Sequence, residues 1–286
     1  MSDFDIKGML FSFDQLSDTY LHDEVEEALR HREEATPHLI KVIESVADNP
    51  LLYSLEQRNA HVYAAAILSH LEETAAHRPF IRAFSIPEEQ LVDIWGDITT
   101  EILPTFLFRT CGGSLEAIKE LIGNREVDQY VRCAAMEALS YAVVAQPERR
   151  AEVVRFFLGL FTGEEAERDS FFWANLAATL CDLHPGESME VLRRAYEEGL
   201  IHKGFISLED IEKINDMDFD ATMERLRGWT ADRAPADVHA YISWFAEFHQ
   251  EELERMSPPA KDKGKKKKGQ AKAKPAKKSG KKKKRR

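Results

Sequence analysis

The stretch "AIKELIGNREVDQYVRCAAMEAL", residues 117–139, contains two apolar segments joined by a short polar connection. Within each segment apolar residues recur three and four positions apart, which is the period of a helix with a buried face. The second segment is rich in alanine, whose small side chain lets neighbouring helices approach closely. The stretch therefore predicts a helical hairpin.

Segments like the first half of this hairpin recur along the chain. Each has an aliphatic residue followed at once by a basic one, and successive basic residues lie 41, 37, 36 and 38 positions apart. The five pairs are Ile40-Lys41, Ile81-Arg82, Ile118-Lys119, Val154-Arg155 and Leu192-Arg193. Between them lies a second set, "HVYAAAILSHL", "DITTEILPTFL", "VRCAAMEAL" and "FFWANLAATL". A fixed period of this size, built from helix pairs, indicates an α-solenoid.

Start and stop signals place the helix ends. Thr36-Pro37 supplies an N-cap and a first-turn proline, Ser114 and Ser207 precede two further helices, and Pro147 follows the end of another. Period-two alternation is almost absent. We therefore expect an all-α fold, a solenoid of stacked helical hairpins without a sheet.

The chain divides into two parts by composition. Residues 1–256 are expected to form a helical repeat domain of about five helix pairs, and residues 257–286 a lysine-rich tail. The domain is expected to end in a long helix over residues 235–256, with Ile242, Phe245 and Phe248 packing on the body as a cap.

The chain resembles a known family at this point. "VRCAAMEAL" is similar to the second helix of a HEAT-like repeat, and the run that includes "WGDITTEILP" resembles the DUF1186 family of uncharacterised bacterial proteins over roughly residues 20–215. The resemblance implies a HEAT-like helical fold and no known activity. Some members end in a small cysteine-rich zinc motif; this tail has no cysteine, so that zinc site is not carried over.

The tail and the body carry opposite charge. Residues 261–286 hold fourteen Lys, two Arg and one Asp, a net charge of +15, which leaves 23 basic and 49 acidic residues and a net charge of −26 for residues 1–260. Because the tail has few apolar residues, we expect it to be disordered. Its charge can dock on the acidic body, bind nucleic acid or simply aid solubility.

Of these three roles, we favour sequence-independent association with RNA or DNA, because the phosphate backbone is a denser polyanion than scattered carboxylates. Lysine dominates over arginine and no aromatic residue is interleaved, which argues against base recognition. The residues expected to carry the contact are Lys265, Lys266, Lys267, Lys268, Lys281, Lys282, Lys283, Lys284, Arg285 and Arg286.

The sequence gives indications of the cellular compartment in which the protein is expected. The N-terminal residues "MSDFDIKGML" do not resemble a secretory signal, and no stretch approaches the roughly 18 apolar residues of a membrane span. Cys111, Cys133 and Cys181 are far apart in sequence, which favours free thiols in a reducing compartment. We expect a cytoplasmic monomer without a cofactor.

Two groups of residues are candidates for chemistry. His70, Glu73 and His77 follow at i, i+3 and i+7, so one helical face could offer two imidazoles and a carboxylate to a metal. The simpler interpretation is a solvated helix end.

The second group is Asp93, Asp97 and Glu101, at i, i+4 and i+8. These carboxylates could act in general acid–base catalysis or bind a divalent cation. The alternative is that Gly96 ends one helix and Asp97 caps the next.

Other residues have both a functional and a structural interpretation. Lys41, Arg82, Lys119, Arg155 and Arg193 could line a groove that grips an acidic partner, or could flank the buried stripe with their heads in water. Cys133 is expected in the core despite its neighbour Arg132. Core positions are also expected for Trp95, Trp173, Trp229 and Trp244.

Two classes of function follow. The favoured one is a non-enzymatic interaction protein. Its acidic helical body binds a protein partner, its charge favouring a basic one, and its tail adds an electrostatic contact with nucleic acid. The alternative is a metal-binding protein or enzyme that uses His70 and His77, or Asp97 and Glu101.

Overall fold

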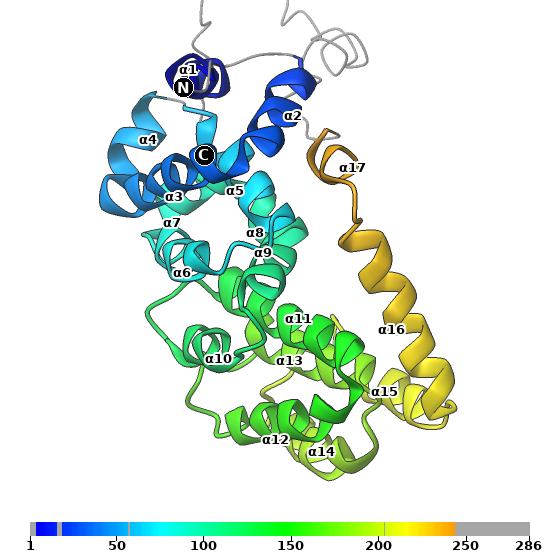
Figure 1. Cartoon of the computed structure of the whole chain (residues 1–286). Helices are drawn as coiled ribbons and strands as arrows, with labels where there is room; N and C mark the ends of the chain where they lie inside the picture. The colour runs from blue at the N-terminus through cyan, green and yellow to red at the C-terminus, as the bar shows by residue number, and fades with distance from the viewer. Residues whose placement is uncertain (1–3, 16–18, 57, 203, 244–286) are drawn as a thin grey trace, which may run out of the picture. The chain divides into compact units, whose positions relative to one another are not determined.

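The computed structural model describes residues 4–15, 19–56, 58–202 and 204–243, and within these ranges every regular element is a helix (Figure 1). The all-α class expected from the sequence is confirmed. The α-helices of the described residues are α1 (Ile6–Asp14), α2 (His22–Arg30), α3 (Arg32–Asp48), α4 (Pro50–Glu56), α5 (Ala60–His70), α6 (His77–Phe84), α7 (Glu88–Trp95), α8 (Ile98–Glu101), α9 (Leu103–Thr110), α10 (Glu116–Gly123), α11 (Gln129–Ala145), α12 (Arg150–Leu160), α13 (Phe171–Asp182), α14 (Met189–Glu197), α15 (Leu208–Asn215), α16 (Phe219–Arg233) and α17 (Val238–Ile242).

Three short 3-10 turns precede α6, α12 and α14 and lead into them; they are Thr74–Ala76, Pro147–Arg149 and Gly186–Ser188. None of the described helices is both long enough and apolar enough to span a membrane.

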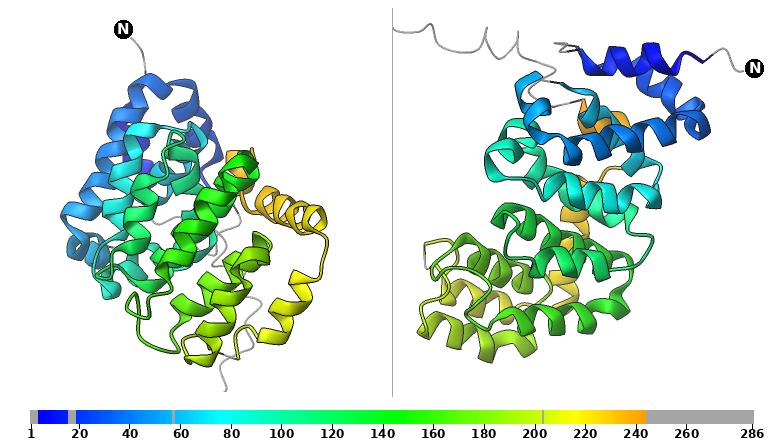
Figure 2. Two further views of the ribbon diagram at one scale, coloured as in Figure 1. Left: turned by 90° about the horizontal axis from the view of Figure 1, so that it is seen from below. Right: turned by 90° about the vertical axis from the view of Figure 1, so that its left-hand side faces the viewer.

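The two predicted helix sets are both present. The five aliphatic-basic pairs lie on α3, α6, α10, α12 and α14, which we call the first helices. The segments of the second set lie on α5, α9, α11 and α13, which we call the second helices, and one of these segments, "DITTEILPTFL", is divided between α8 and α9. α3 packs on α5, α6 on α9, α10 on α11 and α12 on α13. Second helices also pack on one another in chain order, α5 on α9, α9 on α11 and α11 on α13 (Figure 2). Assignment to the HEAT-like solenoids stays a prediction.

The second helices form the centre of the core. Every residue of α5 from Ala60 to Ser69 is buried, and α11 buries twelve of its residues. A helix that is apolar on all sides belongs in a protein interior. Small side chains such as Ala65 and Ala135, both fully buried, let these helices lie close together.

One predicted helix start is wrong. α3 begins at Arg32, so Pro37 lies inside the helix and not in its first turn. Only His31 separates α2 from α3. A proline in a helix interior removes one backbone hydrogen bond. The buried stripe that includes Leu39 and Ile43 keeps the helix continuous through this position, so packing outweighs the local signal.

Other boundary signals were closer to the observed ends. Ser207 caps α15, because its hydroxyl oxygen accepts a hydrogen bond from the backbone N–H of Asp210 at 3.1 Å. α11 ends at Ala145, two residues before Pro147. α10 begins at Glu116, with Leu115 in place of the predicted Ser114 at the N-cap position.

The last described helices run back along the second helices, and we call residues 219–242 the return segment. α16 packs on α11 and α13, and α17 packs on α5 (Figure 1). Arg109 on α9 donates hydrogen bonds to the carbonyl oxygens of Ala234 at 3.0 Å and Pro235 at 2.6 Å. Tyr241, which is buried, donates to the carbonyl oxygen of Ile102 at 3.2 Å.

The predicted terminal helix is only partly described. α17 begins at Val238, later than the predicted residue 235, because the Asp237 side chain caps it by accepting from the N–H of His239 at 3.0 Å. Ile242 is fully buried, as expected. Phe245, Phe248 and the rest of residues 244–286, including the tail, lie outside the described residues.

Enlarging a fully buried alanine tests the close packing of the second helices. We expect Ala135→Leu to lower the free energy of unfolding by about 1–3 kcal/mol, because extra methyl groups overpack a dense core. The matched change Ala151→Leu, at an exposed position of α12, should stay within about 0.5 kcal/mol of the parent. Urea denaturation measures both. Equal stability of the two variants would mean that α11 is not tightly packed.

Candidate functional site

The predicted His70, Glu73 and His77 group is not assembled. His70 ends α5 and lies beside Ala236 of the return segment, whereas His77 begins α6 and is buried. The Nδ1–H of His77 donates to the Thr110 hydroxyl at 3.0 Å, because that hydroxyl already donates to the carbonyl of Phe106. The Glu73 carboxylate accepts from the N–H of Ala75. The three side chains therefore serve three different local contacts.

The predicted carboxylate group is also dispersed. Gly96 ends α7 with a φ of +45°, so the chain turns between Asp93 and Glu101. Asp97 occupies the N-cap position of α8, as the alternative predicted, but its side chain makes no capping hydrogen bond. Asp93 accepts a hydrogen bond from the Ser54 hydroxyl at 2.6 Å. Glu101 pairs with Arg233 of the return segment. The structural alternative given by the sequence describes these residues better than a shared catalytic face does.

Cys133 lies in the core, as expected. Burial raises the pKa of its thiol far above the usual value, so the reactive thiolate is disfavoured. The neighbouring Arg132 points elsewhere: it donates to the carbonyl oxygens of Ile122 at 2.7 Å and Glu165 at 2.9 Å and lies 4.1 Å from the ring centroid of Phe172. The thiol is therefore a packing group.

Three of the five recurrent basic residues pair with a carboxylate on a neighbouring helix, Arg82 with one on the preceding first helix and Lys119 and Arg193 with one on a following helix. Arg82 pairs with Asp48 at 2.5 Å, Lys119 with Glu152 at 2.5 Å and Arg193 with Glu212 at 3.2 Å; Lys41 and Arg155 are exposed. The hydrogen bond from Lys119 lowers the pKa of Glu152. Such pairs are each worth about 0–1 kcal/mol. They weigh against a groove for an acidic partner, although that role stays a prediction.

The tryptophans divide. Trp95 and Trp173 are buried, as expected, but Trp229 is 52% exposed, so its predicted core position is wrong. Trp229 lies on α16, and its Nε1–H donates to the Glu137 carboxylate on α11 at 3.3 Å. A helix that packs on the body by one face leaves its other residues in solvent. Trp244 lies outside the described residues.

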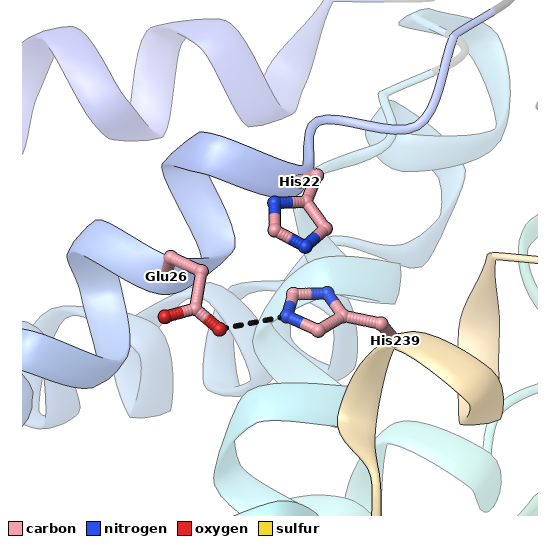
Figure 3. Close-up of side chains that lie close together, drawn as sticks. All are labelled: His22, Glu26 and His239. Atoms are coloured by element: carbon pink, nitrogen blue, oxygen red, sulfur yellow. Dashed lines mark hydrogen bonds and ion pairs between the residues drawn. The ribbon is translucent and has the colours of Figure 1, made fainter.

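A cluster that sequence analysis missed joins the two ends of the described chain. His22 and Glu26 lie on α2, and His239 lies on α17 (Figure 3). Each offers a potential metal-ligand atom, and these atoms lie within 4.8 Å of one another. The Nε2 of His239 is 2.8 Å from Oε1 of Glu26, and the rings of His22 and His239 stack with centroids 4.0 Å apart.

Hydrogen bonds orient both imidazoles of this cluster. The Tyr20 hydroxyl lies 2.8 Å from Nδ1 of His239, and Oδ1 of Asp23 lies 3.3 Å from Nδ1 of His22. The hydrogen bond from His239 lowers the pKa of Glu26. The i, i+4 spacing of His22 and Glu26 was visible in the sequence, but nothing there placed His239 beside them.

Exposed apolar side chains form a second feature, which we call the apolar row. It comprises Leu51, Leu55, Val92, Tyr130 and Phe205, with exposed fractions of 60, 73, 63, 44 and 49%. Val92 and Tyr130 line one hollow of about 190 Å³, together with the acidic residues Glu88, Asp97 and Asp128.

Members of the apolar row lie on elements that contact one another. α4, which carries Leu51 and Leu55, packs on α7, which carries Val92. The ring of Phe171 lies between Tyr130 and Phe205. Its centroid is 5.0 Å from that of Tyr130 and 5.1 Å from that of Phe205. Tyr130 is thus linked to Val92 through the hollow and to Phe205 through Phe171, and the members of the row lie on α4, α7, α11 and the loop after α14.

The fold defines an all-α protein built on buried central helices, with paired helices around them. A family model described as "Protein of unknown function (DUF1186)" matches residues 5–249, and the chain belongs to this family. The resemblance to this family that was seen in the sequence is thereby confirmed.

Two similar proteins come from chlamydiae. An uncharacterised protein of Chlamydia muridarum (strain MoPn / Nigg) is 33% identical over 191 residues, which cover 66% of this chain and 76% of the relative. An uncharacterised protein of Chlamydia trachomatis serovar D is 32% identical over 191 residues with the same coverage. No solved structure matches the chain.

Buried imidazoles predict a dependence of stability on pH. Burial lowers the pKa of His61 from 6.5 to about 4, and the Nε2–H of this ring donates to the carbonyl of Ile94 at 2.8 Å. Between pH 6.5 and 4 the unfolded chain binds a proton on this residue that the folded chain does not. Stability contributed by His61 is therefore lost as the pH falls through this window, by about 1.4 kcal/mol per pH unit.

We expect His61→Gln to reduce the loss of unfolding free energy between pH 7.5 and pH 5 by about 2 kcal/mol relative to the parent. Glutamine keeps a donor for Ile94 but does not titrate. His38→Gln, at an exposed position, is the control and should leave the loss unchanged. Urea denaturation at the two pH values gives the comparison, and equal losses in all three proteins would contradict a buried neutral His61.

Proposed function

We propose that the chain is a non-enzymatic interaction protein whose apolar row binds a basic, amphipathic segment of a partner protein. The observation that carries this proposal is the row itself, in which large apolar side chains stand in solvent across several helices. Contiguous exposed apolar surface with a polar rim is typical of a docking site.

The charges around the row favour a basic partner. Glu88, Asp97 and Asp128 line the hollow between Val92 and Tyr130, and the exposed Asp93 follows Val92. An amphipathic helix can place apolar residues against the row and lysine or arginine side chains against these carboxylates. The net charge of −26 over residues 1–260 attracts such a segment at long range.

A non-enzymatic role is supported by the dispersal of both catalytic groups suggested by the sequence. His70 and His77 make separate contacts, and Gly96 turns the chain between Asp93 and Glu101. The three free cysteines support a reducing compartment, and we propose that the protein acts as a monomer in the cytoplasm.

The +15 charge of residues 261–286 supports a second proposed contact, with RNA or DNA. Lysine contacts with phosphates are sequence-independent and weaken steeply with salt. The acidic body is expected to oppose this contact at long range, so the association should be weak.

Docking at the apolar row is tested with a fluorescent amphipathic peptide whose helix carries leucine on one face and lysine on the other. We expect Leu55→Ser and Val92→Ser to weaken its binding on the order of ten-fold each, because each change removes an exposed anchor. Phe11→Ser is the control: Phe11 is 68% exposed but lies on α1, outside the row. Fluorescence anisotropy measures the dissociation constants. Equal weakening by the Phe11 change, or no binding to the parent, would refute docking at the row.

The tail is tested with a labelled oligonucleotide at low salt. We expect the full chain to bind and a chain that ends at Pro259 to bind much more weakly, with affinity falling as salt rises because counterions are released. Anisotropy titrations at two salt concentrations measure this. Equal binding by the two proteins, or none by either, would show that the tail aids solubility or docks on the body. The peptide experiment is independent of this outcome.

A further inference from the structure

The geometry points to a divalent metal site formed by His22, Glu26 and His239, which would take a first-row transition metal such as Zn²⁺. Two imidazole nitrogens and a carboxylate oxygen are ligands that zinc accepts, and three protein ligands leave further positions for water. The site lies on α2 and α17 and is separate from the apolar row, so it does not depend on the proposed function.

The ligand atoms lie close to the distances that a metal needs. Zinc binds nitrogen and oxygen ligands at about 2.0–2.2 Å, so ligand atoms around a tetrahedral ion are about 3.4 Å apart. The three atoms already lie within 4.8 Å of one another. The side chain of His22 is 57% exposed and that of Glu26 47% exposed, so small rotations can close the remaining gap.

The hydrogen bonds around the cluster match those of metal-binding histidines. Such histidines hold one ring nitrogen in a hydrogen bond and present the other to the ion. Nδ1 of His239 contacts the Tyr20 hydroxyl and Nδ1 of His22 contacts the Asp23 carboxylate. Both Nε2 atoms are thereby turned toward the cluster, as Figure 3 shows.

Local charge supports a cation at this position. His22 is the first residue of α2, where the helix dipole is positive and opposes a cation. Three carboxylates offset this effect, because Asp23 and Glu24 lie in the first turn and Glu26 in the next. Arg30, on the same helix, is paired with Glu27.

A metal here would join parts of the chain that are far apart in sequence. Glu26 and His239 are separated by 213 positions, and their hydrogen bond already connects α2 with α17. An ion bound to both helices would hold the return segment against the N-terminal helices. Metal binding should therefore raise the melting temperature of the whole chain.

Titration calorimetry with Zn²⁺ on the full, tag-free chain tests the site. We expect one ion per chain, and weakening on the order of ten-fold or more in His239→Gln and in Glu26→Gln, because each removes a ligand. His38→Gln, an exposed histidine on α3, should bind like the parent. Binding of Co²⁺ should give visible ligand-field absorption without a thiolate charge-transfer band, which distinguishes the cluster from the three cysteines.

The variants must also be shown to fold. In the presence of a chelator, the circular dichroism of each variant should match that of the parent and thermal unfolding should stay cooperative. Some loss of melting temperature is expected for His239→Gln, because His239 is partly buried and hydrogen-bonded to Tyr20 and Glu26. A variant that fails to fold is replaced by His22→Gln, which changes an exposed residue. Absence of saturable one-to-one binding by the parent would overturn the site. Equal affinity in the folded ligand variants and in His38→Gln would overturn it as well, because it would show adventitious binding to surface histidines.

Discussion

Burial of the second helices on nearly every side is the constraint on which the structure depends. α5 exposes almost none of its residues, and α11 is buried along most of its length. Helices without a solvent face need neighbours all around them. The first helices cover them on one side and the return segment on another. Small residues such as Ala65 and Ala135 make this arrangement possible, because a larger side chain would push the helices apart.

The sequence predicted the parts of the fold that are set by local periodicity. Both helix sets lie where the repeated segments placed them, except that "DITTEILPTFL" is divided between α8 and α9, and the Ser207 cap was correct. Sequence-based prediction was less reliable where tertiary packing determines the start of a helix or the burial of a side chain. The sequence placed a helix start at Pro37, but α3 begins at Arg32. Packing of its buried residues stabilises the helix on both sides of the proline. Trp229 was expected in the core, but its helix lies on the surface of the body.

The candidate sites show the same limit more clearly. Spacing on one helix was enough to suggest His70 with His77, yet a turn between α5 and α6 separates them into different environments. His22 and Glu26 have the spacing of neighbours on α2, but their third member comes from the other end of the body. No local pattern could place His239, because its position results from the path of the return segment.

The return segment also fixes how many helix pairs the protein can have. A simple array of helix pairs can gain or lose a member, because each pair contacts only its neighbours. Here residues 219–242 reach from α13 back to α5, and α16 with its 15 residues is about 22 Å long. One additional layer of helices would add about 8–10 Å to that path. A duplication of one pair would thus require a matching extension of α16, so the count of pairs and the length of the last long helix must evolve together.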